Sequence, residues 1–295
     1  MDNKLDNELT LVNDIEKELT DINGLLFINS GVLVSNESYH ITNFVKDIKT
    51  IGIKLYKVSI KLYKFSKAIR DFAVNKIVSE KKIHENFNML AGAVGDIHMT
   101  RAYVENVPTF QEQRARFLGL MRVVDYIEKS AGMSVNSMPT GDIYIENIAR
   151  LSNGVLTISK PDEGSTFKNL TWKAPNLVEY DLKSSPWANV RNLDQIKNIS
   201  IKCKYDMVDK LQLAANKIAK RCDEARDEYS NSLGGYDDQN NTGEYDRIQY
   251  EMAALYSLSY SIEKAIRQVM SEGLRKEVNT FTNKYLVRLK KYEYR

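Results

Sequence analysis

The stretch IGIKLYKVSIKLYKFSKAI, residues 51–69, decides the fold class because IKLYK recurs in it after seven residues. A seven-residue apolar repeat is typical of an α-helix that packs against other helices. At about 100° per residue, one apolar seam follows one side of this helix: Leu55, Val58, Leu62, Phe65 and Ile69. A second seam lies roughly opposite: Ile53, Tyr56, Ile60 and Tyr63. A helix with two apolar sides packs on two neighbours. We therefore expect an inner element of a helical bundle.

A stripe of lysines between the two seams is the most suggestive polar feature. It consists of Lys54, Lys57, Lys61 and Lys64, with Tyr56 and Tyr63 interleaved. Lysines on such a face bind nucleic-acid phosphates, and tyrosines stack on bases. Lysines also keep a helix edge in water while their stems cover apolar surface, and they attract acidic partners. Solvation, nucleic acid and an acidic partner stay open as interpretations.

The prolines divide the chain into three parts. All five lie between Pro108 and Pro186, and long helices exclude proline because it lacks a backbone donor and clashes with the preceding turn. We predict an N-terminal helical arm (1–107), a proline-containing central region with one helix and short strands (108–186), and a C-terminal helical hairpin (187–295). The expected fold is mainly α: a bundle of long heptad-patterned helices with a small β-containing central insert.

Apolar spacing places the individual elements. Helices are predicted at residues 2–22, 37–80, 83–106, 110–130, 142–152, 203–232 and from 244 towards the end. Three runs rich in β-branched and aromatic residues, which could form one small antiparallel sheet, follow the central helix: 154–160, 165–172 and 176–182. Gly273 is expected to weaken or bend the last helix, whose apolar pattern shifts after it.

The first predicted helix is acidic. Leu5, Leu9, Val12, Leu19 and Ile22 form its apolar stripe, and residues 1–23 carry seven acidic residues against two lysines, a net charge of −5. Such a helix is expected to pair with a basic helix of the same molecule or of a neighbouring subunit.

The last helix is rich in tyrosine, and several of its tyrosines fall off its main apolar seam. Tyrosine combines a large apolar body with a polar tip and is common at protein interfaces. We therefore predict a second contact surface on this helix, formed by Tyr250, Tyr256, Tyr260, Tyr285 and Tyr292.

Motifs of catalysis are missing from the sequence. There is no P-loop, HExxH or GxSxG, and no His or Cys pair has zinc-ligand spacing. Cys203 and Cys222 would lie about 28 Å apart on one helix, too far for a disulfide. We predict no catalytic, cofactor-binding or metal-binding residues, no enzyme activity and no membrane span. Free thiols and an acidic N-terminus without a signal-peptide pattern favour a cytoplasmic protein, or one within a particle assembled there.

These patterns favour a non-enzymatic structural or interaction subunit that packs with itself or with other proteins of a larger assembly. A component of a viral or phage particle would have this profile. The alternative is a nucleic-acid-binding protein that uses residues 46–70, where eight basic residues face one acidic residue. The net charge of +3 is too small to make the whole chain a polycation, so binding must come from local patches.

Overall fold

The computed structural model describes residues 41–95, 101–139, 141–161, 167–181, 190–233, 242–286 and 289–292. The helices are α2 (Ile41–Lys76), α3 (Glu80–Gly95), α4 (Phe110–Ser130), α5 (Gly141–Leu151), α6 (Val190–Leu233), α7 (Thr242–Gln268) and α8 (Arg275–Thr280). Short helical segments are η1 (Val135–Ser137), η2 (Val269–Leu274) and η3 (Phe281–Tyr285), and the strands are β1 (Arg101–Val107), β2 (Leu156–Ser159), β3 (Asn169–Trp172), β4 (Val178–Asp181) and β5 (Leu289–Tyr292). The fold is mainly α-helical with a small β part, as the sequence predicts.

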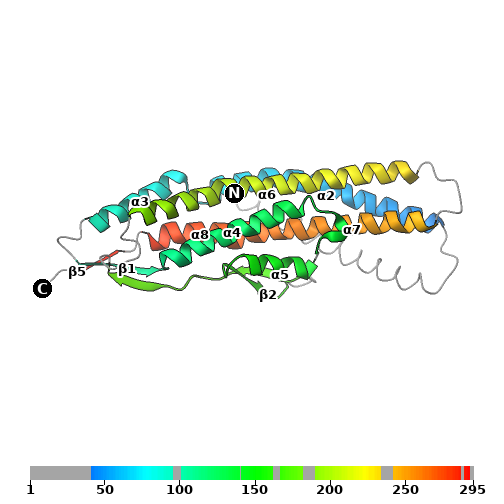
Figure 1. Cartoon of the computed structure of the whole chain (residues 1–295). Helices are drawn as coiled ribbons and strands as arrows, with labels where there is room; N and C mark the ends of the chain where they lie inside the picture. The colour runs from blue at the N-terminus through cyan, green and yellow to red at the C-terminus, as the bar shows by residue number, and fades with distance from the viewer. Residues whose placement is uncertain are drawn as a thin grey trace.

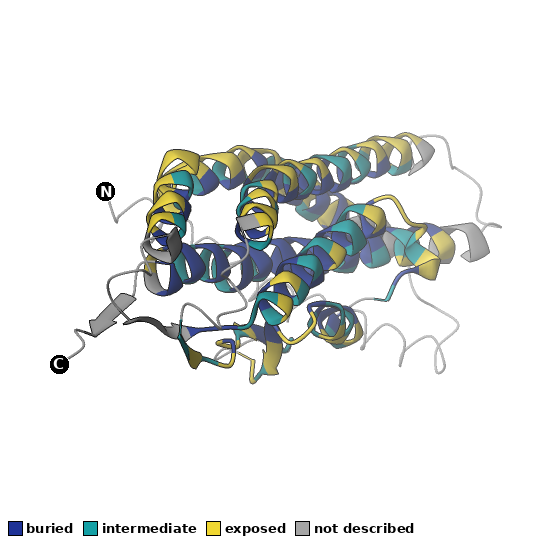
Figure 2. Cartoon of the chain, turned by 60° about the vertical axis from the view of Figure 1, so that its left-hand side comes forward, coloured by how far each residue is buried: buried dark blue, intermediate teal, exposed yellow. Residues whose placement is uncertain are grey.

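Long helices run side by side along the molecule (Figure 1). The helix α6 packs against α2, α3, α4 and α7, and α2 runs antiparallel to it along much of its length. Buried side chains from all of these helices form one hydrophobic core, and the inward surfaces of the helices carry the buried residues in Figure 2. Within the described residues, no helix combines the length and the apolar character that crossing a membrane requires.

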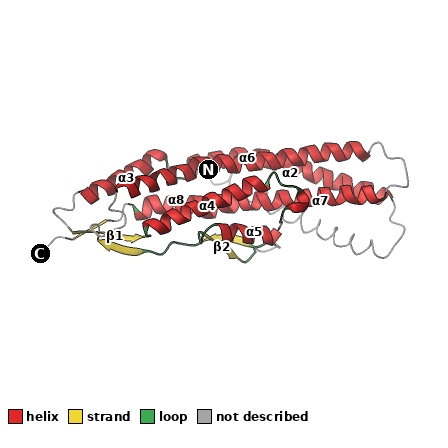
Figure 3. Cartoon of the chain, viewed as in Figure 1, coloured by secondary structure: helices red, strands yellow, loops and turns green. Residues whose placement is uncertain are grey.

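Two small sheets accompany the bundle, and they differ from the single sheet that the sequence suggests (Figure 3). Strands β2 and β3 pair with each other, with Leu156 opposite Trp172. Strand β4 instead joins β1 and β5 in a three-stranded antiparallel sheet of order β4-β1-β5. The predicted helix 83–106 is therefore wrong from Arg101 onward, where the structure has β1, and the predicted last helix gives way to β5 at Leu289. Both errors have one cause, because β1 and β5 are stabilised by strands far away in the sequence.

The helix α4 follows its sequence signals closely. The Thr109 side chain accepts a hydrogen bond from the backbone N–H of Glu112 at 3.0 Å, as an N-cap should. The helix ends at Ser130, and its apolar residues Phe117, Val124 and Ile127 are buried. The cap and the apolar spacing therefore predicted this element correctly.

The last long helix changes its winding at the glycine singled out in the sequence. Gly273 lies in the π-helical segment η2, and a second π-helical segment, η3, follows α8. A π turn contains more residues than an α turn, so it shifts the apolar pattern around the helix. This shift keeps Val269, Val278 and Phe281 buried on both sides of the interruption.

Candidate functional site

The helix α2 buries only one of its two apolar seams. Leu55, Leu62 and Ile69 are fully buried. On the second seam Ile53 is 57% exposed, Tyr56 43% and Tyr63 44%, and Ile60 is partly exposed. The expectation that this helix is covered on both sides therefore does not hold in the structure. Two apolar seams are visible in the sequence, but which of them meets α6 and α7 is decided by the packing of the whole chain.

The four lysines border this exposed seam. Each directly follows a seam residue in the sequence, so each lies about 100° further round the helix. Lys57 and Lys64 are exposed, and Lys54 and Lys61 are partly exposed. We call the four seam residues and the four lysines together the α2 face. An apolar stripe with a positive border fits a partner that is itself amphipathic and acidic.

Contacts within the chain reach the ring of Tyr56 and the backbone carbonyls of both tyrosines of the α2 face. The Arg226 guanidinium of α6 lies over the Tyr56 ring, 4.5 Å from its centroid. Asp223 and Asp227 form ion pairs with this arginine. The buried hydroxyl of Ser59 donates to the Tyr56 carbonyl oxygen at 2.8 Å, and that of Ser66 donates to the Tyr63 carbonyl at the same distance. Arg226 therefore supports the Tyr56 ring, and part of this ring remains exposed to solvent.

Most of the tyrosines predicted as a second interface lie inside the chain. Tyr256, Tyr260 and Tyr285 are buried, because α7 and the segments after it are surrounded by other elements of the same chain. Tyr250 is 63% exposed, and Tyr292 lies in β5 opposite Arg101. The three buried tyrosines cannot meet a partner while the bundle is closed, so only Tyr250 remains as an exposed candidate among the side chains whose burial is described.

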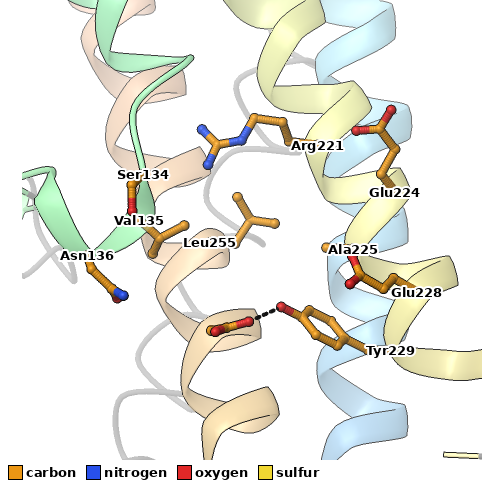
Figure 4. A pocket seen from close by; sticks show the side chains of 10 residues that line it. Ser134, Val135, Asn136, Arg221, Glu224, Ala225, Glu228, Tyr229 and Leu255 are labelled. Carbon is orange, nitrogen blue, oxygen red and sulfur yellow. Dashed lines mark hydrogen bonds between the residues drawn. The ribbon is translucent and has the colours of Figure 1, made fainter. Parts of the chain in front are cut away.

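A cavity of about 320 Å³ lies between η1, α6 and α7 (Figure 4). Its lining includes side chains of both charges, such as Arg221, Glu228 and Glu251. The Arg221 guanidinium donates to the Ala131 carbonyl at 2.8 Å, and the Tyr229 hydroxyl donates to Glu251. Burial, together with Glu251, raises the pKa of Tyr229. Its phenol therefore stays protonated and serves as a donor that ties α6 to α7.

A buried ion pair that the sequence did not reveal lies between α4 and α8. The Arg116 Nε and Nη2 atoms each lie 2.8 Å from a different carboxylate oxygen of Glu277. Gln113 Nε2 and Trp172 Nε1 also donate to this carboxylate, at 2.9 and 2.7 Å. Arg116 further donates to the Lys173 carbonyl. Gln113, Arg116 and Glu277 are buried and Trp172 is partly buried, so we assign the cluster to the packing of α4, α8 and β3. No local pattern in the sequence marks Glu277 as its centre.

The two cysteines lie on α6 and are buried free thiols. Burial raises the pKa of Cys222 to about 12, and the pKa of Cys203 is raised by the same cause. Buried protonated thiols are weak nucleophiles. Among the described residues, no group of three or more His, Cys, Asp or Glu side chains is arranged to hold a metal ion.

Comparisons of the chain with protein-family models, with curated proteins and with solved structures find no match. A functional proposal therefore depends on the geometry of this chain.

Proposed function

We propose that the protein is a non-enzymatic structural subunit of a larger assembly, and that it packs with copies of itself or with other proteins through the α2 face. The observation that carries this proposal is the exposure of Ile53, Tyr56 and Tyr63 on a helix whose opposite seam is buried except for the partly buried Phe65. A viral or phage particle is one assembly in which such a subunit would serve.

The physical argument rests on the grouping of these side chains. Single exposed apolar residues are ordinary on protein surfaces, whereas contiguous apolar patches rimmed by polar groups mark contact surfaces. Burying apolar area contributes roughly 25 cal/mol per Å², and the lysine border adds selectivity for an acidic partner. Tyrosine and other aromatic residues are enriched in interface cores. The α2 face combines all three features within twelve residues of one helix.

Thiol labelling of an Ile53→Cys variant tests this proposal. The native Cys203 and Cys222 are buried with raised pKa values, so they provide a slow background. We expect the labelling rate at position 53 to fall at least fivefold as the protein concentration rises from about 1 to 100 µM, because association buries the new thiol. Ile143→Cys is the matched control, since Ile143 is 61% exposed on α5, and its rate should not change. If the labelling rates of the two variants depend on protein concentration in the same way, self-association through the α2 face is excluded.

A second candidate function is nucleic-acid binding. It is favoured by Lys57 and Lys64, which are exposed beside the exposed rings of Tyr56 and Tyr63. Four phosphate contacts would make the binding constant for single-stranded nucleic acid fall with a log–log salt slope of about −3.

Fluorescence anisotropy with a labelled single-stranded oligonucleotide of about 20 nucleotides measures this slope. Replacing Lys54, Lys57, Lys61 and Lys64 by glutamine should then abolish binding. Binding that persists in this variant would show that the nucleic acid contacts another surface.

A further inference from the structure

The chemistry of the α2 face restricts what can cover it. Two copies of the α2 face that packed antiparallel would bring Lys54, Lys57, Lys61 and Lys64 of both copies together, because the lysines lie on one side of the seam. Like charges at an interface disfavour association. The fitting partner is a helix with one apolar stripe and acidic flanks, which meets the seam with its stripe and the lysines with its carboxylates.

The chain itself contains one segment of this kind. Residues 2–22, which lie outside the described residues, carry apolar side chains at helical spacing, and residues 1–23 have a net charge of −5. As a helix the segment would be about 32 Å long at 1.5 Å per residue. Ile53 and Tyr63 are ten residues apart on α2, which corresponds to about 15 Å. The segment is therefore long enough to cover the whole seam.

We propose that residues 2–22 of one copy bind the α2 face of a second copy. This inference rests on the proposed role of the α2 face as a contact surface, and it names the partner. Residues 23–40 connect the segment to α2, and eighteen residues span at most about 60 Å when extended. The segment can therefore reach a neighbouring molecule.

A contact of this kind is heterologous, because the two sides of the interface are different surfaces. Each copy donates one segment and accepts another, so copies add head to tail and form a ring where the rotation closes or a filament where it does not. The charge pairing also makes the contact sensitive to salt, since exposed charges are screened within about 10 Å at 0.1 M salt.

Two variants of the full chain separate the two halves of this contact. The face variant carries Ile53→Asp and Tyr63→Asp, at exposed positions of α2. The segment variant carries Leu5→Asp, Leu9→Asp and Val12→Asp, which removes the apolar stripe and keeps the acidic character. Circular dichroism and thermal unfolding show whether each variant retains the wild-type fold.

Light scattering of each variant alone and of their equimolar mixture then gives the test. We expect each variant alone to have the 33.9 kDa chain mass, because each lacks one side of the contact. The mixture should form a species of twice that mass and no larger one. The intact segment of the face variant can still bind the intact α2 face of the segment variant, and no other contact is possible between them. Raising the salt from about 0.1 to 1 M should weaken this heterodimer at least tenfold.

The other outcomes overturn the inference in distinguishable ways. A segment variant that assembles like the wild type, beside a monomeric face variant, would leave the α2 face as the contact surface and exclude the segment as its partner. Two monomeric variants whose mixture stays monomeric would exclude a head-to-tail contact. A monomeric wild-type chain would exclude self-association altogether, and slow labelling of Ile53→Cys in that monomer would place the segment on the α2 face of its own chain.

Discussion

Gly119 shows how a single residue sets the distance between two elements. A Cβ atom at this position of α4 would lie 2.2 Å from the carbonyl oxygen of Ser152 and 2.6 Å from its carbonyl carbon. The turn that carries Ser152 cannot easily yield, because the Ser152 side chain donates to the Ala149 carbonyl and accepts from the N–H of Leu156. The close approach of α4 to this turn therefore requires glycine.

Two glycine-to-alanine changes in helices should have opposite effects. Gly119→Ala should lower the free energy of unfolding by about 3 kcal/mol, because the backbone around Ser152 must move. Gly92→Ala on α3 should raise it by up to about 1 kcal/mol, because nothing lies within 4 Å of the added methyl group and alanine favours the helix. Urea unfolding of the two variants measures both values. A neutral Gly119→Ala would show that α4 is not in contact with the turn.

Buried thiol and phenol groups predict how stability changes at alkaline pH. Cysteine and tyrosine in an unfolded chain ionise near pH 8.5 and 10, whereas burial raises the pKa of Cys222 and of Tyr285 to about 12 in the folded chain. The folded state holds these protons more tightly, so their contribution is complete below about pH 8.5 and is lost as the pH rises towards 12. Each group steepens the decline by up to about 1.4 kcal/mol per pH unit. Urea unfolding between pH 7 and 11 should show this, and Tyr285→Phe should flatten the decline above pH 10.

At the scale of elements, the Arg116–Glu277 pair connects α4 to α8, and Trp172 adds β3 to the same cluster. Both side chains of the pair are almost completely buried. Removing one member leaves the other as an unpaired buried charge, which is costly, whereas apolar replacement of both is often tolerated. The cluster therefore predicts a strongly non-additive pair of substitutions.

We expect Glu277→Ala to lower the free energy of unfolding by about 3–5 kcal/mol. The double variant Arg116→Met with Glu277→Leu should be closer to the wild type than Glu277→Ala is. The control is Glu224→Ala, because the Lys220–Glu224 pair is exposed, and its effect should stay within about 0.5 kcal/mol. If the stability lost by the double variant equals the sum of the losses of Arg116→Met and Glu277→Leu alone, Arg116 and Glu277 are not energetically coupled.

The elements also show where sequence patterns suffice. Apolar residues three and four apart identify the helices α2 and α4, because helical hydrogen bonds and the buried stripe are both local in the sequence. The prediction for α6 is correct at its end but begins at residue 203, whereas the helix begins at Val190. Strands β1 and β5 pair across a long separation in the sequence, with Arg101 opposite Tyr292, so no local window contains the reason for their pairing. The role of the buried Glu277 cannot be predicted from the sequence for the same reason, since its partners Arg116 and Trp172 belong to two other elements.

At the scale of the whole molecule, the α2 face was visible in the sequence only in part. The heptad repeat identified both seams and the lysine border, and the structure confirms that Leu55 and Leu62 line the core. The repeat could not tell that Ile53, Tyr56 and Tyr63 are exposed, because α6 and α7 both pack on the other side. The tyrosines of the last helix were misassigned for the converse reason, since the folded chain surrounds that helix with its own elements.

The solution mass of the wild-type chain and of the variant with Ile53→Asp and Tyr63→Asp tests the central claim most directly. Light scattering after size exclusion gives both masses, and absorbance at 260 nm in the same run reports bound nucleic acid. We predict an oligomer free of nucleic acid for the wild type, and the 33.9 kDa chain mass for the variant with an unchanged circular dichroism spectrum. Equal masses for the two proteins would contradict the claim that the α2 face joins copies of this chain.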